Sequence, residues 1–357
     1  MAANNSNAQT RGERLRRKAG SVIVDGAFRG LSRVGRLHPR ARPERHGVEV
    51  IRNVRYGGSD IDAHLLDVYR PRRVDGPLPV VLYVHGGGFR ILSKDTHWLM
   101  GLAFARRGYL VFNINYRLAP DHPYPAAVED CAEAYAWLQS NAHEWGGDPS
   151  QLVLAGESAG GNLVTSLAVA SCYTRTEPFA RRVFDTGVVP GAVIAACGLL
   201  QVSDIGRFKR RKPKIGRWLQ DRLEEVTDAY LPADLEDSPL ADLADPLRVI
   251  ENLDLDPDRP LPPFFAPVGT KDPLLDDTRR LARALDARNA TCEARYYPGE
   301  VHAFHAFIWR KHAMDEKCYG TKRMAGRCIL PLYKKAEQHF RCICTTGSEL
   351  RIRSGCF

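Results

Sequence analysis

The sequence has no uninterrupted apolar run of the roughly 18–20 residues that a helix needs to cross a bilayer. Its N-terminus lacks the apolar core of about 7–15 residues that marks a secretory signal peptide, because polar residues there are followed by basic ones. These two absences argue against a membrane-spanning or secreted chain. A cytoplasmic location is therefore the expectation.

The nine cysteines also lack an informative spacing. Five of them lie within residues 311–357, and the pair Cys342 and Cys344 does not match the usual ligand spacings of zinc sites. Without a secretory context a disulfide framework is not expected. The cysteines are therefore predicted to be free thiols, and neither a metal nor a cofactor is expected.

The chain carries a formal net charge of +9, concentrated in basic clusters at residues 11–18, 36–45 and 207–217. Such clusters could contact nucleic acid or an anionic membrane surface. No nucleic-acid-binding motif stands beside them, so no nucleic-acid partner is expected. Solvated, solubilising faces are the favoured interpretation, with membrane contact as the alternative.

From residue 48 onwards, short apolar segments alternate with segments of helical spacing. The predicted strands are 48–56, 64–71, 78–86, 109–117, 151–156, 192–197, 263–270 and 292–299. The predicted helices are 97–108, 126–142, 165–172 and 278–290. This alternation is typical of an α/β protein with a mostly parallel sheet and helices on both faces. Ligands of such sheets bind at the carboxyl ends of the strands, so the residues after each strand are the candidates for chemistry.

Two further segments depart from this alternation. Residues 199–262 contain charged blocks, several prolines and only local helical pattern, which indicates an insertion between two core strands. The first 47 residues are basic and contain apolar residues at near-helical spacing. These residues predict an amphipathic element with one buried face formed by Val22, Val24, Phe28, Leu31 and Val34.

A serine follows the strand at 151–156. Gly156, Ser158 and Gly160 form a G-x-S-x-G pattern between that strand and a predicted helix. Glycines on both sides of a serine allow a sharp turn that exposes the hydroxyl above the sheet. The start of the next helix offers amide groups to a developing negative charge. The pattern predicts a nucleophile at Ser158.

A histidine and three glycines follow the strand at 78–86. Consecutive glycines let backbone N–H groups approach an oxyanion without interference from Cβ atoms. A phosphate-binding loop would continue with Gly-Lys-Ser/Thr, whereas Phe89 and Arg90 follow here. We expect His85 to hold this loop through a hydrogen bond rather than to act as a base.

An acid and two histidines follow the last two predicted strands. Asp272 comes just after the strand at 263–270, while its rivals Asp276 and Asp277 are predicted to begin the next helix. The strand at 292–299 leads into His302 and His305. Serine, acid and histidine thus occur in the chain order expected for α/β hydrolases. Its place nearer the strand end favours His302 as the base, but does not by itself decide against His305.

Over about residues 48–310 the chain resembles the hormone-sensitive-lipase-like branch of the α/β hydrolases, because it contains five of their motifs in the same order. The motifs are HGGG at 85–88, NYRLAPDHPYPAAVED at 115–130, GESAG at 156–160, DPL at 272–274 and HAF at 302–304. The resemblance implies an α/β-hydrolase fold with a mostly parallel eight-stranded sheet, helices on both faces and a helical cap. The implied domains are a cap segment at 1–47, a catalytic domain at 48–310 with a cap insertion at 199–245, and an atypical tail at 311–357.

The resemblance also implies a carboxylesterase that cleaves short- to medium-chain acyl esters through a serine acyl-enzyme. Ser158 would be the nucleophile, His302 the base and Asp272 its partner, because His302 has the family's spacing from the acid. Gly87, Gly88 and the amide of Ala159 would form the oxyanion hole, supported by His85 and Gly86. Glu157 departs from the aspartate that often precedes the serine.

Two other functions remain open on the sequence. An amidase or peptidase would use the same three residues, and a non-catalytic ligand-binding protein could share the fold. Plant hormone receptors of this type lose the base histidine, whereas serine, acid and histidine are all present here. The expected partner is a small-molecule ester, and a homodimer is compatible with the sequence.

Overall fold

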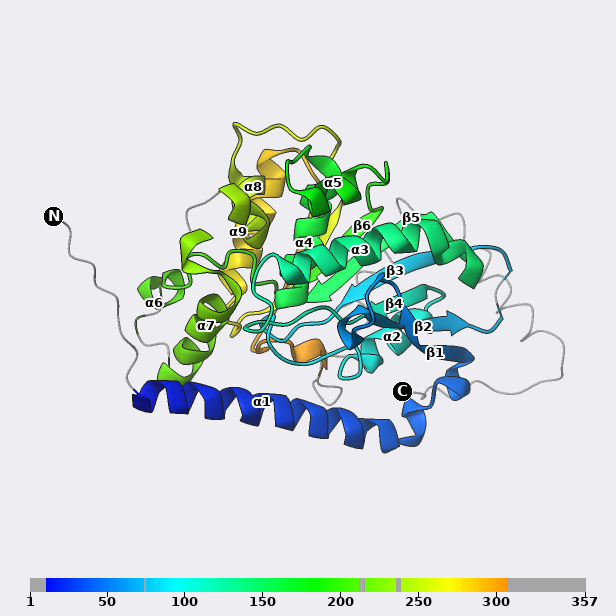
Figure 1. Ribbon diagram of the computed structural model, residues 1–357, viewed down its shortest axis with the longest axis horizontal. Helices are drawn as coiled ribbons and strands as arrows, with labels where there is room; N and C mark the ends of the chain where they lie inside the picture. The colour runs from blue at the N-terminus through cyan, green and yellow to red at the C-terminus, as the bar shows by residue number, and fades with distance from the viewer. Residues whose placement is uncertain (1–10, 74, 212, 214–215, 236–238, 307–357) are drawn as a thin grey trace.

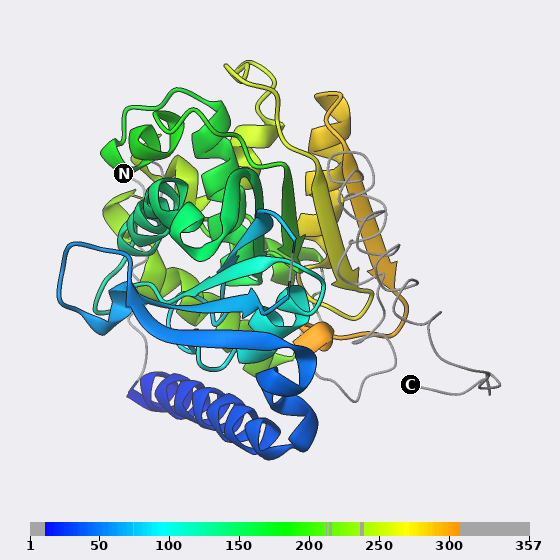
Figure 2. The same cartoon turned by 90° about the vertical axis from the view of Figure 1, so that its right-hand side faces the viewer.

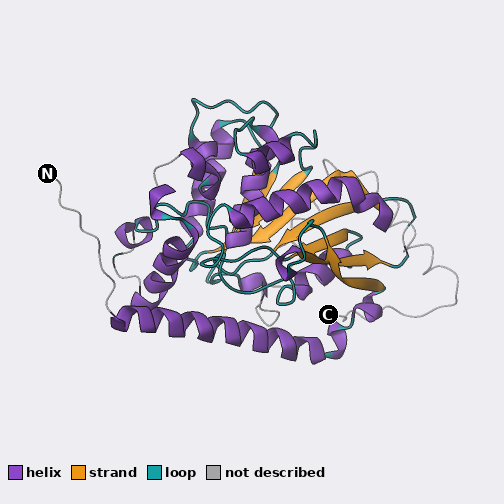
Figure 3. Cartoon of the chain, viewed as in Figure 1, coloured by secondary structure: helices purple, strands orange, loops and turns teal. Residues whose placement is uncertain are grey.

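The computed structural model describes residues 11–306, except 74, 212, 214–215 and 236–238. The predicted tail at 311–357 therefore lies outside the described residues, as do residues 1–10. The centre of the fold is one eight-stranded sheet (Figures 1 and 3). In chain order its strands are Val48–Arg55 (β1), Leu65–Pro71 (β2), Leu78–Val84 (β3), Leu110–Ile114 (β4), Gly147–Glu157 (β5), Ala192–Ala196 (β6), Phe264–Gly269 (β7) and Cys292–Tyr297 (β8).

The spatial order of the strands is β1-β2-β4-β3-β5-β6-β7-β8. Only β2 runs against its neighbours β1 and β4, and every pair from β4 to β8 is parallel. This confirms the predicted α/β-hydrolase sheet. The carboxyl ends of β3, β5, β7 and β8 point to one edge, which brings together residues far apart in the chain.

The helices lie on both faces of this sheet (Figure 2). Alternate residues of β3 face opposite sides, with Val80 and Leu82 packed in the larger core and Val81 in the smaller one that includes α2. The helices are Arg11–Leu37 (α1), Trp98–Ala105 (α2), Ala126–Asn141 (α3), Ala159–Cys172 (α4), Pro178–Phe184 (α5), Arg207–Arg211 (α6), Arg217–Tyr230 (α7), Pro246–Glu251 (α8) and Leu275–Ala287 (α9).

Some helix predictions were incomplete. The helix expected at 165–172 begins at Ala159, directly after the serine, and α5 and α8 were not predicted. Every residue of α4 is buried, so its sequence shows no alternation between a polar and an apolar face. The insertion between β6 and β7 contains a helix, α7, that its mixed charges obscured.

The prediction for the N-terminal segment was wrong about which face is buried. The segment is a long helix, but Val22, Leu31 and Val34 are exposed and Phe28 is half-buried, while nothing is described for the side chain of Val24. Small and polar residues on the other side of α1 contact the protein instead. Those residues allow close approach and supply hydrogen bonds, which the apolar pattern alone does not show.

Those contacts attach α1 to the segment that follows β3. Ser32 Oγ donates to the carbonyl of Asp95 at 3.1 Å and accepts from Trp98 Nε1 at 3.1 Å. The N–H of Leu92 donates to Asp25 Oδ1 at 3.3 Å. Near the other end, Gly20 lies so close to the Arg222 guanidinium of α7 that an added Cβ would be 2.7 Å from its carbon.

Two predictions from composition can be compared with the described residues. Cys131, Cys172, Cys197 and Cys292 are free thiols, as predicted, and the other five cysteines lie outside the described residues. Among the helices that the structure describes, none combines the length and the apolar character required to cross a membrane.

Candidate active site

Ser158 lies in a strained turn between β5 and α4. Its backbone has φ 54° and ψ −116°, a region that residues with a Cβ rarely adopt. Gly160 makes the turn possible, because a Cβ there would lie 2.1 Å from the carbonyl oxygen of Val84. The N–H of Ser158 donates to the carbonyl of Ala196 at 2.9 Å, which fixes the turn against β6.

The structure brings Ser158, His302 and Asp272 together at the carboxyl edge of the sheet. His302 Nε2 accepts the Ser158 hydroxyl proton in a hydrogen bond of 3.0 Å. His302 Nδ1 donates to Asp272 Oδ2 at 2.9 Å and to Oδ1 at 3.1 Å. Asp272 is fully buried, and its Oδ1 also accepts from the N–H of Leu274 at 2.8 Å. The carboxylate is therefore fixed in the orientation that holds the imidazole.

The rivals of these residues lie elsewhere. As predicted, Asp276 and Asp277 are in the first turn of α9. Asp277 is buried and accepts from the Arg207 guanidinium and from the N–H of Leu200. His305 contacts Glu157 rather than Ser158.

The environment of His302 favours its protonated form. Burial opposes a charge on the imidazole and lowers its pKa, but the neighbouring Asp272 carboxylate outweighs this and holds the pKa well above the ordinary value of about 6.5. Because only the neutral ring accepts a proton, the pKa of His302 sets the acidic limit of any reaction in which it is the base.

Cys197 is a neighbour that sequence reasoning missed. It follows β6, is buried, and has one ligand atom within 4.8 Å of those of Asp272 and His302. Cysteine, aspartate and histidine can bind metals, but burial raises the pKa of the Cys197 thiol, and the two ring nitrogens of His302 are used by Asp272 and Ser158. The arrangement thus fits a hydrogen-bonded network better than a metal centre. Cys197 could have been identified from the sequence by its position at the end of a predicted strand.

The glycine loop after β3 lies beside Ser158. Its backbone is in the left-handed half of conformational space at Gly87 (φ 117°) and Gly88 (φ 60°). His85 is buried, and its Nδ1 donates to the carbonyl of Gly86 at 2.6 Å. Burial and the nearby His97 lower the pKa of His85 to about 3, so this ring is neutral. Among the hydrogen bonds of the described residues, none is donated by the N–H of Gly87, Gly88 or Ala159.

A second buried cluster lies directly behind the serine. Glu157 accepts from His97 Nε2 at 2.7 Å through one oxygen and from His305 Nε2 through the other. Burial disfavours the charge on Glu157, but the two histidines outweigh it and hold its pKa well below the ordinary range. The residue before Ser158 therefore holds the segment that carries His302. Neither Glu157 nor His97 was singled out from the sequence for this contact, because no local pattern pairs residues so far apart.

Helix α7 covers the glycine loop. Phe89 and Tyr230 stack with ring centroids 3.7 Å apart, and Arg90 Nη1 forms an ion pair of 2.7 Å with Glu225. An added Cβ on Gly88 would lie 2.7 Å from Val226. The insertion between β6 and β7 therefore reaches the loop beside Ser158.

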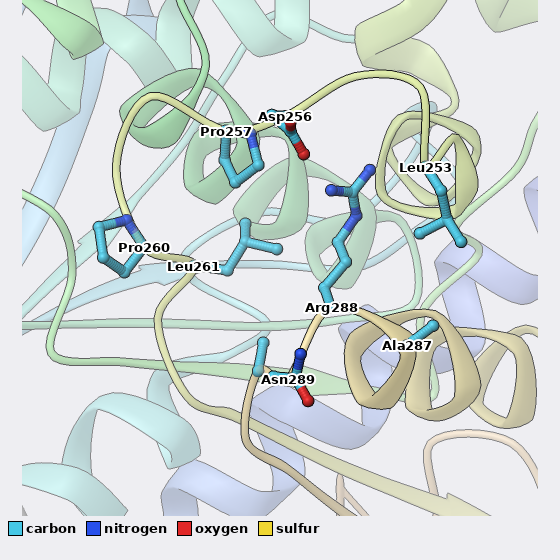
Figure 4. Close-up of a pocket in the computed structure, with 9 residues that line it drawn as sticks. Leu253, Asp256, Pro257, Pro260, Leu261, Ala287, Arg288 and Asn289 are labelled. Carbon is cyan, nitrogen blue, oxygen red and sulfur yellow. The ribbon is translucent and has the colours of Figure 1, made fainter.

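A hollow of about 430 Å³ lies at a different place in the fold, and Figure 4 shows the residues that line it. Its lining includes Leu253, Leu261 and Arg288. Leu261 precedes β7 and Ala290 precedes β8, so the hollow lies where these strands begin. It is therefore at the sheet edge opposite to Ser158.

Comparison with known proteins places this chain in a family. A family model described as having the alpha/beta hydrolase fold matches residues 81–306. Carboxylesterase NlhH of Mycobacterium tuberculosis is 32% identical over 289 residues, which cover 80% of this chain and 82% of that protein. The structure is similar to that of a bacterial heroin esterase, with a TM-score of 0.65 and 24% identity over 82% of this chain and 87% of that one. Esterase LipW from Mycobacterium marinum gives a TM-score of 0.62 and 24% identity over 81% of this chain and 83% of that one.

The sheet order and the residues at its carboxyl edge define an α/β hydrolase. The chain belongs to the hormone-sensitive-lipase-like family of these hydrolases, as its sequence motifs implied.

Proposed function

We propose that this protein is a serine carboxylesterase in which Ser158 is the nucleophile, His302 the base and Asp272 its partner. The observation that carries the proposal is the continuous chain of hydrogen bonds from Ser158 Oγ through His302 to Asp272. The name of its relative NlhH, a carboxylesterase, supports the same reaction. No metal or cofactor takes part in the proposed mechanism.

The reaction begins when Ser158 Oγ attacks the ester carbonyl and His302 Nε2 takes the hydroxyl proton. Asp272 stabilises the imidazolium that forms. His302 then gives the proton to the leaving alcohol, and the acyl group remains on Ser158. A water molecule, activated by the same imidazole, releases the acid and restores the serine.

The tetrahedral intermediate needs donors for its oxyanion. The N–H groups of Gly87, Gly88 and Ala159 are proposed for this role, since they border Ser158 from two sides. His85 and Gly86 support the loop, because the hydrogen bond from the neutral His85 ring fixes the peptide that precedes Gly87.

The proposed substrates are short- to medium-chain acyl esters. The insertion at 199–245 and the segment at 1–47 are proposed to form a cap. The contacts of α7 with the glycine loop and of α1 with α7 support this proposal. In this arrangement α7 would border the acyl group, while α1 would hold α7 from outside.

Matched substrates test the reaction class. A series of nitrophenyl esters from acetate to palmitate should give a maximum of kcat/KM among the short or medium acyl chains. A matched nitroanilide should react far more slowly than its ester. Equal rates on the amide would favour the amidase alternative, and tight binding of both without turnover would favour a non-catalytic binding protein.

The pH dependence of kcat/KM provides a prediction for Asp272. Protonation of His302 removes the base, so activity should rise with pH through the pKa of this ring, at a pH above about 6.5. Asp272→Asn removes the carboxylate that raises this pKa and leaves the burial that lowers it. The acid limb should then move to lower pH, while kcat falls by about 10⁴. The profile is measured in a pH-stat, and an acid limb that stays in place would contradict the assignment of Asp272.

A prediction for the oxyanion site uses the first residue of α4. Proline is tolerated at the first position of a helix, so Ala159→Pro deletes a single N–H of α4, although its ring also restricts the backbone of Ser158. One lost donor should lower kcat by about 10²–10³. Ala159→Gly, which keeps the N–H, is the matched control and should remain near the parent rate. Folding of both variants is checked by circular dichroism, and a folded proline variant with full activity would show that Ala159 is not a donor.

A further inference from the structure

The outward face of α1 carries large apolar side chains in contact with solvent. Half of the large apolar side chains exposed in the described part of the chain lie on this one helix. Ile23 is 68% exposed, Val34 65% and Leu37 80%. Single exposed apolar side chains need no explanation, but several gathered on one helix indicate an interaction surface.

These side chains share one side of the helix. At about 100° per residue, Val34 points about 20° to one side of Ile23 and Leu37 about 40° to the other, so the three side chains lie within one sector of the helix. Gly26 and Gly30 lie between them in open space, so the backbone there is also accessible. The opposite side of α1 holds the helix to the protein through the contacts of Asp25, Ser32 and Arg36 with the segment 92–98.

The same helix is strongly basic. Its sequence contains eight Lys and Arg residues and two acidic residues, so its net charge is 8 − 2 = +6, out of +9 for the whole chain. Arg29 and Arg33 lie beside the apolar face on the helix surface and are both exposed, although Arg29 Nε also pairs with Asp25 Oδ2 at 2.7 Å. An apolar face bordered by arginines is the pattern of a helix that lies in a membrane interface.

We propose that the outward face of α1 docks on an anionic lipid surface, with the helix parallel to the membrane plane. Ile23, Val34 and Leu37 would enter the boundary between headgroups and acyl chains, while the arginines would contact lipid phosphates. From charge alone, the basic clusters are expected to be solvated faces. The exposed apolar side chains beside them are the new observation that favours a lipid surface.

A second copy of the chain is a poorer occupant of this face. Two copies meeting through α1 would bring together two helices of net charge +6, which repel each other. The residues from 22 to 37 span only about 24 Å of one helix, which is narrow for an interface that must bury roughly 1,200–2,000 Å². An anionic lipid surface would instead neutralise the positive charge of α1 and cover the helix along its whole length.

The position of α1 gives this docking a direction. The helix runs along the outside of the molecule and is joined to the segment that follows the glycine loop (Figure 1). A lipid surface beneath α1 would therefore lie on the same side as the loop at 86–92. The inference goes beyond the proposed function, and it does not depend on the reaction at Ser158.

Vesicle flotation tests the proposal with the full chain. Vesicles of equal parts phosphatidylcholine and phosphatidylglycerol should bind the protein, whereas pure phosphatidylcholine should bind it far less. Vesicle binding should weaken about tenfold in each of the variants Ile23→Gln, Val34→Gln and Leu37→Gln. Each substitution removes an apolar side chain that would move from water into the lipid on docking. Arg29→Gln with Arg33→Gln should weaken it by a further tenfold or more at about 0.1 M salt, where charges act over roughly 10 Å.

Leu253→Gln with Leu255→Gln is the matched control, because these leucines are also exposed but lie on the loop between α8 and β7. This variant should bind like the parent. All variants should keep their rate on a water-soluble ester, which shows that the fold is intact. Equal binding to both vesicle types, or binding that the three apolar substitutions leave unchanged, would overturn the proposal. A parental dimer that the same substitutions convert to a monomer would overturn it too, in favour of a second copy.

Discussion

Replacing Ser158 by alanine should lower kcat for ester hydrolysis by about 10⁶. Loss of the nucleophile removes the acyl-enzyme pathway altogether, and the remaining rate comes from binding and oxyanion donors. The strained backbone at Ser158 is maintained by its neighbours, namely Gly160 and the hydrogen bond to Ala196, so alanine should adopt the same turn. The loss should therefore appear in kcat, with folding unchanged in circular dichroism.

A matched control lies in α4, the helix that follows Ser158. Ser171 is buried in α4, and its hydroxyl donates to the carbonyl of Ala168. Ser171→Ala should retain most activity. An organophosphonate should label the parent at the peptide that contains Ser158 and should leave Ser158→Ala unlabelled. Hydrolysis by Ser158→Ala within about tenfold of the parent, or labelling at another serine, would contradict the assignment.

Replacing His302 by glutamine should cost nearly as much as losing the serine, because the base and the nucleophile act as a unit. Glutamine fills much of the same space but cannot accept the Ser158 proton. The neighbouring His305 provides the matched comparison. His305→Gln can still place an N–H near Glu157, so the loop that carries His302 should stay close to its position.

The expected loss for His305→Gln is about tenfold in kcat, with a stability cost of about 1–2 kcal/mol for an imperfect buried hydrogen bond. Rates are measured on a soluble nitrophenyl ester, and stability by urea unfolding. If His305→Gln were the inactive variant and His302→Gln the active one, the base would have been assigned to the wrong histidine. The double variant should be no slower than His302→Gln alone.

The sheet could be predicted from the sequence because its inner strands are largely buried on both faces, whereas the outer strands β1 and β8 are only partly buried. Buried strands appear in a sequence as short continuous apolar runs. All eight strands of the sheet were located within a few residues of their observed bounds. Ser158, Asp272 and His302 could be proposed as site residues because each follows a strand within a few residues. The parallel arrangement then brings residues together that the chain separates by up to 144 positions.

Other features have no local pattern. Glu157 contacts His97 and His305, which are 60 and 148 residues away, so only the folded chain reveals the cluster. The face of α1 was predicted wrongly for a different reason. Apolar spacing identifies an amphipathic helix, but it does not show which face the protein covers, and here glycine and polar contacts hold the other side.

The long connection between β6 and β7 has a consequence for how this protein can vary. These two strands are adjacent and parallel, and the chain between Ala196 and Phe264 leaves the sheet to reach the glycine loop through α7 before it returns. Closing a longer loop costs only about 0.6 kcal/mol for each doubling of its length. Insertions and deletions in this connection can therefore change the segment that covers the glycine loop at little cost to folding, while Ser158, Asp272 and His302 keep their places.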